Sequence, residues 1–319
     1  MWITTKSILQ HNLKQQTSRI RNLGGGDNMC KCLIIGCGTV GTNLCTEISA
    51  LNPDTYDKYK KIDSRPYKLS PVEDTMYATK TFSRYDVAFI CVDTPLVDDN
   101  MLDTTEVINA LQENDAEIYV IKSTCPVGTT TSLSKKLHKR IVYSPEYYGG
   151  TQHCNNFEFN FTILGGETSD CIEVQQLLQE CYDARHTFHI VDSDTTELVK
   201  LMENSWIATK VSFCTQFYNI AQDYNIKYEQ LRELFILDPR VNPSHTFVYR
   251  DHPYWDSHCL NKDMPYTSSL AGAELLKSIC KFNETQKERF NTPPVTFDDT
   301  YVPSIMGLDP TTGEWGHNS

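Results

Sequence analysis

The sequence has no apolar run that approaches the roughly 20 residues a membrane-spanning helix needs, and it is poor in basic residues. Its 29 Lys and Arg face 41 Asp and Glu, for a formal net charge of -12. Broad binding to nucleic acid or to an anionic membrane requires a positive field, so we expect neither as a partner. A phosphate-bearing ligand must then meet local cations or backbone N–H groups.

The twelve cysteines lack the spacing of a disulfide framework or of a zinc finger. Several, such as Cys32, Cys91 and Cys214, lie inside apolar runs, where cysteine acts as a small hydrophobic residue. We therefore expect a reducing compartment and a cytoplasmic protein.

Residues 1–28 contain no acid before Asp27, a composition that superficially fits an organellar transit peptide. A simpler interpretation is an N-terminal extension or an early start, because Met29 directly precedes the first apolar run and glycines at 24–26 resemble a linker. We expect this extension to be disordered.

Short runs rich in β-branched and aromatic residues alternate with amphipathic stretches along the first part of the chain. This alternation predicts an α/β fold, a Rossmann-type doubly wound parallel sheet with right-handed crossovers. The predicted strands are residues 32–35, 55–57, 87–92, 118–121, 141–143, 161–164 and 188–191.

The pattern changes after Asp192, where residues 194–197 resemble a capping box and open a helical stretch to about Tyr224. We place a domain boundary there, with a Rossmann domain at 29–192 and an α-helical domain at 193–290. Further helices are predicted at 228–237 and 269–290, separated by a loop at 245–258. The tail at 291–319 is rich in Pro, Asp, Thr and Gly, which predicts irregular structure.

The motif Gly-Cys-Gly-Thr-Val-Gly at 36–41 follows the first strand and opens a helix. The glycines alone are weak evidence, but this context is typical of a dinucleotide-binding turn. Gly36 permits the tight turn, Gly38 lets the backbone approach a pyrophosphate, and Gly41 allows close packing of helix on strand. The helix N-terminus then faces the phosphates, so Thr39 and Val40 join the cofactor site.

Asp57 ends the second predicted strand, at the distance after the glycines where such folds carry an acid. A carboxylate there accepts hydrogen bonds from the adenosine ribose and repels a 2′-phosphate, so we predict NAD rather than NADP. Asp54 is the competing candidate.

Five separated motifs, taken in order, resemble the UDP-glucose/GDP-mannose dehydrogenase family over roughly residues 29–285. They are Cys-Val-Asp-Thr-Pro at 91–95, Ser-Thr-Cys-Pro-Val-Gly-Thr-Thr at 123–130, Ser-Pro-Glu-Tyr-Tyr at 144–148, Glu-Leu-Val-Lys-Leu-Met-Glu-Asn at 197–204 and Cys-Leu-Asn-Lys-Asp at 259–263. The first motif implies that Val92, Thr94 and Pro95 line the cofactor site.

The resemblance implies a reaction in which the primary alcohol of a nucleotide sugar, here a UDP-sugar, is oxidised to a carboxylate with NAD. It makes Cys259 the nucleophile, which forms a thiohemiacetal and then a thioester that water hydrolyses. Lys262 is close enough in sequence to supply a positive field beside the sulfur and to contact the substrate. Arg240 matches an arginine near the substrate, where its guanidinium suits a diphosphate, or else fixes its own loop by a salt bridge.

The remaining site residues implied by the resemblance are polar. Lys200 and Asn204, one turn apart on a helix, match residues that bind the substrate and stabilise oxyanion intermediates. Thr124, Glu146 and Asp263 match residues that organise water or assist proton transfer. Thr124 also matches the cofactor site, and Glu146 the substrate site.

The resemblance fails at several positions. Family members usually place a Gly-Gly loop before the cysteine, where this chain has Tyr-Trp-Asp-Ser-His at 254–258, and replacing glycine restricts φ and adds side chains. The family's second acid after Ser-Pro-Glu is Gly150 here, and its Asn-Glu pair is Thr215-Gln216. The chain resembles a short form of the family without the C-terminal nucleotide-sugar-binding domain.

Two other interpretations stay open at this point. A 3-hydroxyacid-type dehydrogenase would use NAD and Lys200 for one hydride transfer and would not need Cys259. A catalytically impaired NAD-binding interaction protein would account for the bulky residues in place of glycine. The set His252, Asp256, His258 and Cys259 resembles metal ligands but also suits a polar pocket, and we predict no metal.

We also predict a homodimer. A long apolar helix at about 196–224 is poorly covered in a chain of this length, and Trp206, Phe213 and Phe217 are the candidate contacts.

Overall fold

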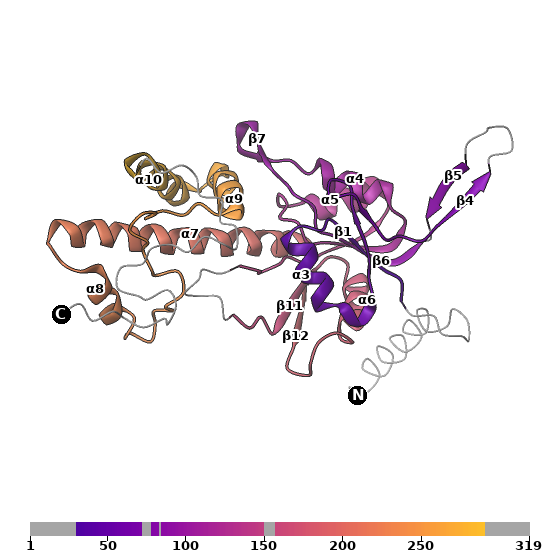
Figure 1. The fold of residues 1–319 in the computed structure, drawn as a ribbon, viewed down its shortest axis with the longest axis horizontal. Coiled ribbons are helices and arrows are strands. Elements are labelled where there is room, and N and C mark those ends of the chain that lie inside the picture. Colours follow the sequence, from indigo (N-terminus) through magenta and orange to yellow (C-terminus); the bar gives the residue numbers. More distant parts are fainter. Residues whose placement is uncertain (1–29, 72–77, 83, 150–156, 291–319) are drawn as a thin grey trace, which may run out of the picture.

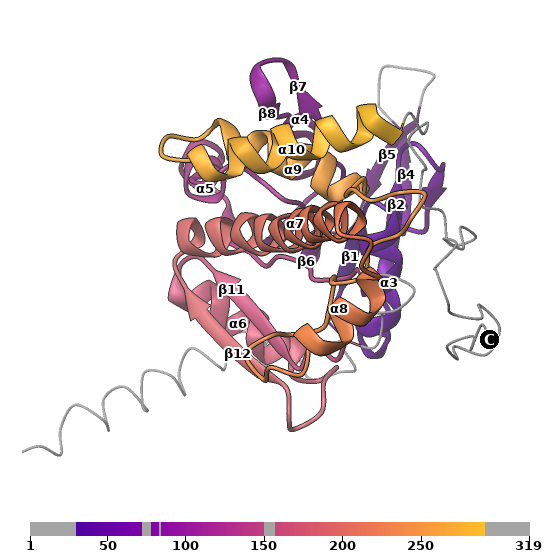
Figure 2. The ribbon, with the colours of Figure 1, turned by 90° about the vertical axis from the view of Figure 1, so that its left-hand side faces the viewer.

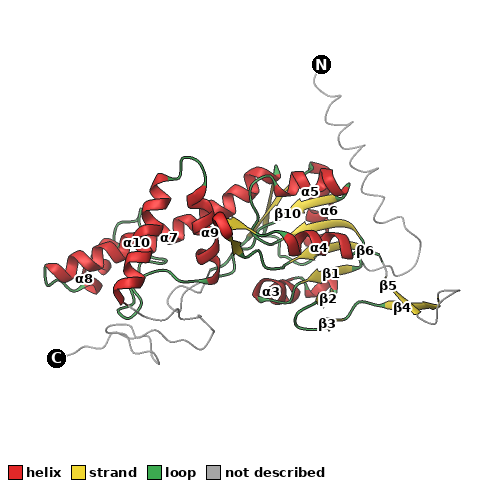
Figure 3. Cartoon of the chain, turned by 90° about the horizontal axis from the view of Figure 1, so that it is seen from above, coloured by secondary structure: helices red, strands yellow, loops and turns green. Residues whose placement is uncertain are grey.

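The computed structural model describes residues 30–71, 78–82, 84–149 and 157–290 (Figure 1). The predicted extension at 1–28, the tail at 291–319 and Gly150 lie outside these described residues. A sheet with helices on its faces forms one end of the molecule, and long helices form the other (Figure 3).

Eight strands form one sheet in the order β12-β11-β10-β9-β6-β1-β2-β3. Each strand predicted from the sequence has a counterpart in this sheet, and among its eight strands only the short β3 was not predicted. The bounds are β1 (Cys32–Ile35), β2 (Asp54–Asp57), β3 (Ile62–Asp63), β6 (Tyr85–Ile90), β9 (Ala116–Ile121), β10 (Arg140–Tyr143), β11 (Phe161–Gly165) and β12 (Thr187–Val191). The central strands β1, β6 and β9 are buried on both faces, which explains their nearly continuous apolar runs.

The sheet is mixed rather than wholly parallel. Strands β2, β1, β6, β9 and β10 run parallel to their neighbours, but β11 pairs antiparallel with β10, and β3 antiparallel with β2. A parallel neighbour needs a crossover, usually a helix, and the described parts of the β10–β11 connection contain none. The helix after β11 then returns the chain to place β12 parallel to β11.

Helices cover both faces of the sheet, because successive side chains along each strand point to opposite faces and pack against different helices. On one face, Cys32 and Ile34 of β1 share a core with α3 (Thr39–Glu47) and α6 (Thr168–Leu178). On the other, Leu33 and Ile35 share a core with α4 (Thr105–Glu113) and α5 (Thr129–Leu137). The polar residues that follow the strands are thereby held at one edge of a rigid, two-sided layer.

A 31-residue helix, α7 (Ser193–Asp223), links the sheet to the helical region. Its N-cap is Asp192, whose carboxylate accepts a 2.8 Å hydrogen bond from the Thr195 N–H. The N-cap is therefore two residues before the start of the capping box predicted at 194–197. The carboxylate of Glu197 instead accepts hydrogen bonds from the N–H groups of Gly128 and Thr130, so it caps α5.

The helical region packs around α7. Helices α9 (His258–Ser269) and α10 (Glu274–Phe290) lie on one side of it and α8 (Tyr228–Phe235) on the other (Figure 2). Ala208 of α7 packs with Leu260 and Met264 of α9, while Tyr218 packs with Tyr228 of α8. The predicted helix at 269–290 was right from Glu274 onward, but α9 was not predicted.

The local signals at α9 conflict. Pro265 lies inside the helix and is a strong breaker in sequence terms. Ser257 nevertheless caps it, with its Oγ accepting a hydrogen bond from the Leu260 N–H at 3.3 Å, and buried contacts hold the rest of the helix. Tertiary packing therefore outweighs the break at proline.

Two hairpins extend from the sheet. They are β4 (Tyr67–Pro71) with β5 (Ala78–Phe82), and β7 (Leu96–Val97) with β8 (Met101–Leu102). Among the helices of the described ranges, none combines the length and apolar character that crossing a bilayer requires.

Candidate active site

The glycine motif forms a turn in which a side chain would collide with the backbone at Gly36 and Gly41, whereas Gly38 faces open space. Gly36 has φ +92°, and a Cβ there would lie 2.5 Å from the Cys91 carbonyl oxygen. A Cβ on Gly41 would lie 1.8 Å from the Gly36 carbonyl oxygen, so the helix packs directly on the turn. Gly38, the N-cap of α3, has no atom within 4 Å of the Cβ position. The open side of the turn thus faces the first N–H groups of α3, around Thr39 and Val40, as a bound pyrophosphate requires.

The structure also separates the two candidate acids of β2. Asp57 lies at the carboxyl end of the strand, and its Oδ2 accepts a 2.8 Å hydrogen bond from the Cys37 N–H inside the glycine turn. Burial raises the pKa of Asp57, but N–H donors from Lys60, Cys37 and Tyr59 outweigh it and leave the pKa below its usual value. Asp54 lies at the opposite end of β2 and accepts from the Tyr85 hydroxyl. Asp57 is therefore the anionic group beside the turn, and these residues fit a dinucleotide with free ribose hydroxyls.

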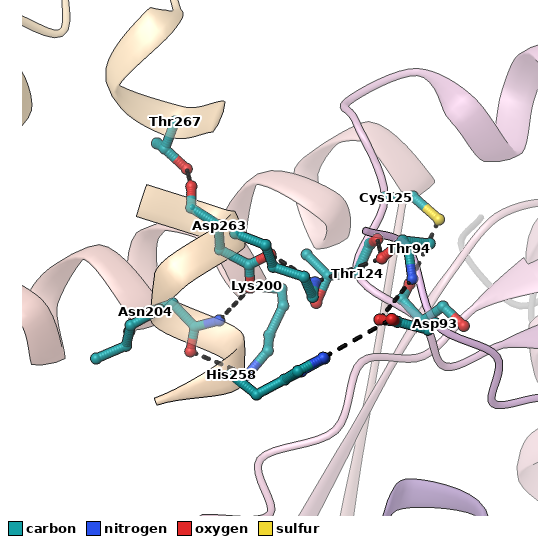
Figure 4. A network of polar contacts seen from close by, with 12 residues as sticks. Asp93, Thr94, Thr124, Cys125, Lys200, Asn204, His258, Asp263 and Thr267 are labelled. Carbon is teal, nitrogen blue, oxygen red and sulfur yellow. Dashed lines mark hydrogen bonds and ion pairs between the residues drawn. The ribbon is translucent and has the colours of Figure 1, made fainter. Parts of the chain in front are cut away.

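A chain of hydrogen bonds starts on α7 and crosses to α9 (Figure 4). The Lys200 ammonium donates to Glu203 Oε2 at 2.7 Å and to Asn204 Oδ1 at 3.3 Å. The Asn204 amide donates in turn to Asp263 Oδ2 at 2.6 Å. Asn204, at 5% exposure, and Asp263, at 1%, are buried, so this contact fixes the two helices against each other away from water.

The same chain continues into the Rossmann part. The Lys262 ammonium donates to Asp263 Oδ1 at 2.7 Å and to Thr94 Oγ1 at 3.3 Å. Thr94, between Val92 and Pro95 on the loop after β6, donates its hydroxyl to the Thr124 carbonyl oxygen at 2.8 Å. Both oxygens of the Asp263 carboxylate are therefore satisfied, which a buried charge needs. Lys262 points to Asp263 and Thr94, so the predicted field beside Cys259 does not come from a contact with this lysine.

Cys259 occupies the first turn of α9, and its side chain is exposed. The first turn of a helix presents N–H groups without intrahelical partners, which favours an anion such as a thiolate. The sulfur thus sits at the surface of the region that the buried network holds in place.

Glu146 belongs to a neighbouring group rather than to the chain described above. It forms an ion pair with Lys122, whose ammonium also donates to Ser144 Oγ at 3.2 Å. Burial raises the pKa of Glu146, although the lysine lowers it in part. Glu146 lines a pocket together with Tyr147, and the Tyr147 ring centroid lies 5.2 Å from Lys200 Nζ. Tyr147 therefore connects the two groups.

Sequence reasoning missed Lys122, which follows β9 inside an apolar run and had no motif to mark it. Arg240 was predicted at the substrate. In the structure its side chain is 87% exposed on the loop after α8 and pairs with Asp238 at 2.6 Å, the loop-fixing contact that was the alternative. A substrate role for Arg240 stays a prediction.

The loop that replaces the family glycines is part of the core. Trp255 is 4% exposed, its backbone N–H donates to Asn283 Oδ1 at 3.0 Å, and its indole N–H donates to Ser212 Oγ at 3.1 Å. The Asp256 carboxylate accepts from Lys287 at 3.1 Å. Side chains that displace the glycines thus anchor the start of α9 to α7 and α10. No group of three His, Cys, Asp or Glu side chains within the described part of the chain is arranged to hold a metal ion.

Taken together, the Rossmann sheet, the open glycine turn and the polar network describe a dinucleotide-binding part joined to a helical part. Two family models match the chain: UDP-glucose/GDP-mannose dehydrogenase family, NAD binding domain, over residues 67–186, and the central domain of the same family over residues 194–285. The chain belongs to this family, and its cofactor is NAD.

Relatives and solved structures agree on the fold. UDP-N-acetyl-D-mannosamine dehydrogenase of Methanocaldococcus jannaschii is 25% identical over 213 residues, 63% of this chain and 48% of that protein. UDP-glucose 6-dehydrogenase of Campylobacter jejuni is 25% identical over 87% of this chain and 77% of its own length. The structure of a UDP-glucose dehydrogenase from Pyrobaculum islandicum has a TM-score of 0.64 at 18% identity, and the match covers 84% of this chain and 73% of that one. The chain spans about half the length of the first curated relatives it matches.

Proposed function

We propose that the chain is an NAD-dependent nucleotide-sugar dehydrogenase that oxidises a sugar primary alcohol to a carboxylate through Cys259. The observation that carries this proposal is the buried contact between Asn204 and Asp263, because it joins the two helices that bear Lys200 and Cys259. The cofactor loop at Thr94 is tied to the same acid through Lys262. The proposed nucleophile, the proposed cation and the predicted cofactor loop thus belong to elements that these contacts join.

The proposed reaction has two oxidations and one hydrolysis. NAD+ accepts one hydride in each oxidation when it is bound. The first removes a hydride from the alcohol carbon and a proton from its oxygen, which gives the aldehyde. Cys259 sulfur then bonds to the aldehyde carbon while the C=O electron pair moves to oxygen. Loss of the second hydride leaves a thioester, and water breaks the C–S bond, releases the carboxylate and returns the electron pair to sulfur.

The surrounding residues have distinct proposed tasks. Two of the three Lys200 N–H groups are used by Glu203 and Asn204, and we assign the third to the substrate oxygen, whose negative charge it stabilises. Burial raises the Glu146 pKa, which brings a carboxyl group closer to the range where it exchanges protons near neutral pH. We assign the water that hydrolyses the thioester to Thr124 and Asp263; each Asp263 oxygen accepts one hydrogen bond within the protein and keeps a second lone pair for this water.

The proposed substrate is a UDP-sugar, because the relatives are named for UDP-glucose and UDP-N-acetyl-D-mannosamine. The proposed assembly is a homodimer that pairs the exposed apolar face of α7. On that face Met202 is 71% exposed, Trp206 61% and Phe213 49%. An apolar patch of this kind is typical of a protein interface.

The test is a screen of the purified chain against UDP-sugars with NAD+, following NADH absorbance and the carboxylate product together. We expect two NADH for each carboxylate formed. One NADH per substrate with an oxidised product that is not an acid would instead favour the single-hydride reaction. No turnover with any sugar, while NAD+ still binds, would contradict the proposal.

A further inference from the structure

The residue directly before the proposed nucleophile is His258, the first residue of α9. Its Nε2 lies 3.7 Å from Oδ2 of Asp93, an ion-pair distance, and its ring also interacts with the neighbouring Cys259 side chain. Figure 4 shows the imidazole reaching from the helical region to Asp93 on the loop after β6. The three side chains form a sequence of acid, imidazole and thiol across the two parts of the molecule.

Asp93 is itself held in position. Its Oδ1 accepts a 2.9 Å hydrogen bond from the Thr94 N–H, which leaves Oδ2 directed at His258. The contact between His258 and Asp93 lowers the pKa of Asp93, and the nearby Lys262 lowers it further. Asp93 is therefore an anion at neutral pH, next to the loop residues that line the cofactor site.

The charge on His258 follows from these neighbours. The contacts with Asp93 and Cys259 raise the pKa of His258 to about 10, against some desolvation. The titratable or charged groups that face the ring are Asp93 and Cys259, with Lys262 behind Asp93. A histidine in this setting is an imidazolium at neutral pH, a fixed cation rather than a base.

We infer that Asp93 and His258 form a carboxylate–imidazolium pair that holds a positive charge against the sulfur of Cys259 and stabilises its thiolate. His258 touches the reacting atom, and Asp93 positions His258. This inference rests on the proposed function only in making Cys259 the nucleophile. The pair lies outside the glycine turn and is joined to the network that holds Asp263 only through Thr94, which Lys262 contacts.

The pair acts on sulfur twice in the proposed reaction. In the addition, a sulfur electron pair forms the C–S bond, and a thiolate supplies it without first losing a proton. In the hydrolysis, water adds to the thioester carbon and releases its two protons to the solvent, the C–S bond breaks, and its electron pair returns to sulfur as thiolate. The imidazolium keeps its proton in both steps. It stabilises the thiolate that begins the addition and the thiolate that the hydrolysis releases.

Fold stability does not account for the arrangement. The side chains of His258 and Asp93 are 74% and 54% exposed, and ion pairs this open to solvent contribute little to the stability of the fold. Trp255 and Ser257 already anchor and cap the start of α9. Removing the imidazole should therefore change the reactivity of the sulfur and leave folding nearly unchanged.

The experiment measures alkylation of Cys259 by iodoacetamide as a function of pH, with no substrate or NAD+, in the full chain. Peptide mass spectrometry assigns the label to Cys259 among the other cysteines. The variants are His258→Asn and Asp93→Asn, with His189→Asn as matched control, because His189 is an exposed histidine on β12 whose ring contacts Thr187. The His258 ring is followed by NMR titration in the same samples.

We expect His258→Asn to slow alkylation of Cys259 at pH 7 about tenfold. Asp93→Asn should have a smaller effect in the same direction and should lower the pH at which His258 titrates. His189→Asn should match the wild type. Unchanged alkylation in His258→Asn, or titration of the wild-type His258 ring near pH 6.5, would overturn the inference.

This assay separates the inference from the proposed function. If the pair controls alkylation but Cys259→Ala keeps full turnover, the pair stands and the role of Cys259 in the reaction falls. If Cys259→Ala abolishes acid formation while His258→Asn leaves alkylation unchanged, the function stands and the pair falls.

Discussion

The amide of Asn204 on α7 donates a 2.6 Å hydrogen bond to Asp263 on α9, and both side chains are buried. Asp263 also accepts from Lys262, so the carboxylate is satisfied only while both donors are present. This one contact therefore couples the stability of the helical region to the geometry around Lys200 and Cys259.

We predict that Asn204→Ala lowers the free energy of unfolding by about 1–3 kcal/mol, because it leaves one oxygen of a buried carboxylate without a donor. The control is Gln216→Ala, an exposed position on the same helix, which should stay within about 0.5 kcal/mol of the wild type. Urea unfolding of the three proteins measures the difference. Equal losses for both variants would show that the contact contributes no more than helix propensity.

Asp57 should decide the choice of cofactor. We predict that the wild type binds NAD+ more tightly than NADP+, and that Asp57→Ala weakens NAD+ binding by about 1–3 kcal/mol through lost ribose hydrogen bonds. Asp54→Ala is the matched control, since that acid lies on the same strand but bonds to Tyr85 at the far end. Calorimetric titration tests both cofactors. Equal or tighter NADP+ binding by the wild type would refute the assignment.

Much of the Rossmann part could be predicted from the sequence, because its signals are local. Buried parallel strands require apolar runs such as 32–35, and the turn requires glycine at positions where a Cβ would collide. The antiparallel β11 was not predictable in this way. Its direction depends on the route of the chain between β10 and β11, and strand composition does not report direction.

The candidate site was predictable by resemblance but not in its contacts. Lys200 and Asn204 are one turn apart, so a shared helix face followed from spacing alone. The hydrogen bond from Lys262 to Thr94 and the ion pair between His258 and Asp93 join residues far apart in the chain. Neither periodicity nor composition indicates such pairs. The helix α9 was missed because Pro265 is a strong local breaker and the packing that overrides it is tertiary.

The contribution of Asp57 to the stability of the fold should depend on pH. Its folded-state pKa lies below the unfolded value near 3.8, so its contribution to stability is present above that value and is lost as pH falls through the folded pKa. We predict that Asp57→Asn is less stable than the wild type at pH 6 and that the gap narrows below about pH 4. Urea unfolding at a series of pH values measures it. A gap that is constant with pH would mean that the charge of Asp57 makes no contribution.

The exposed face of α7 should carry the dimer. Trp206 and Phe213 are exposed on this helix, and Phe213 packs against Phe217 with ring centroids 4.9 Å apart. We predict a dimer at micromolar concentration that Trp206→Glu together with Phe213→Glu converts to monomer, because an interface core does not tolerate unpaired charge. Leu275→Glu, at an exposed leucine of α10, should leave the dimer intact. Light scattering that reports only monomer in the wild type would rule the interface out.

Cys259 is the residue that divides the possible reactions. If its sulfur carries the acyl group, Cys259→Ala should abolish carboxylate formation while NAD+ affinity stays nearly intact, because the glycine turn precedes α3 and Asp57 ends β2, whereas Cys259 is an exposed residue of α9. Cys259→Ser should allow at most slow aldehyde formation, since a serine hydroxyl is a weak nucleophile without an activating base. The matched control is Cys280→Ala, a partly buried cysteine on α10.

The intermediate itself should be observable. Asp263→Asn keeps the shape of the side chain but removes its charge, which should slow the hydrolysis assigned to its water. A substrate-derived thioester should then accumulate on Cys259, and intact-protein mass spectrometry followed by peptide mapping would detect it. Full turnover in Cys259→Ala would eliminate the thioester route and favour a single hydride transfer. A wild type that binds NAD+ but oxidises no sugar would instead favour an interaction protein whose bulky 254–258 loop has replaced the family glycines.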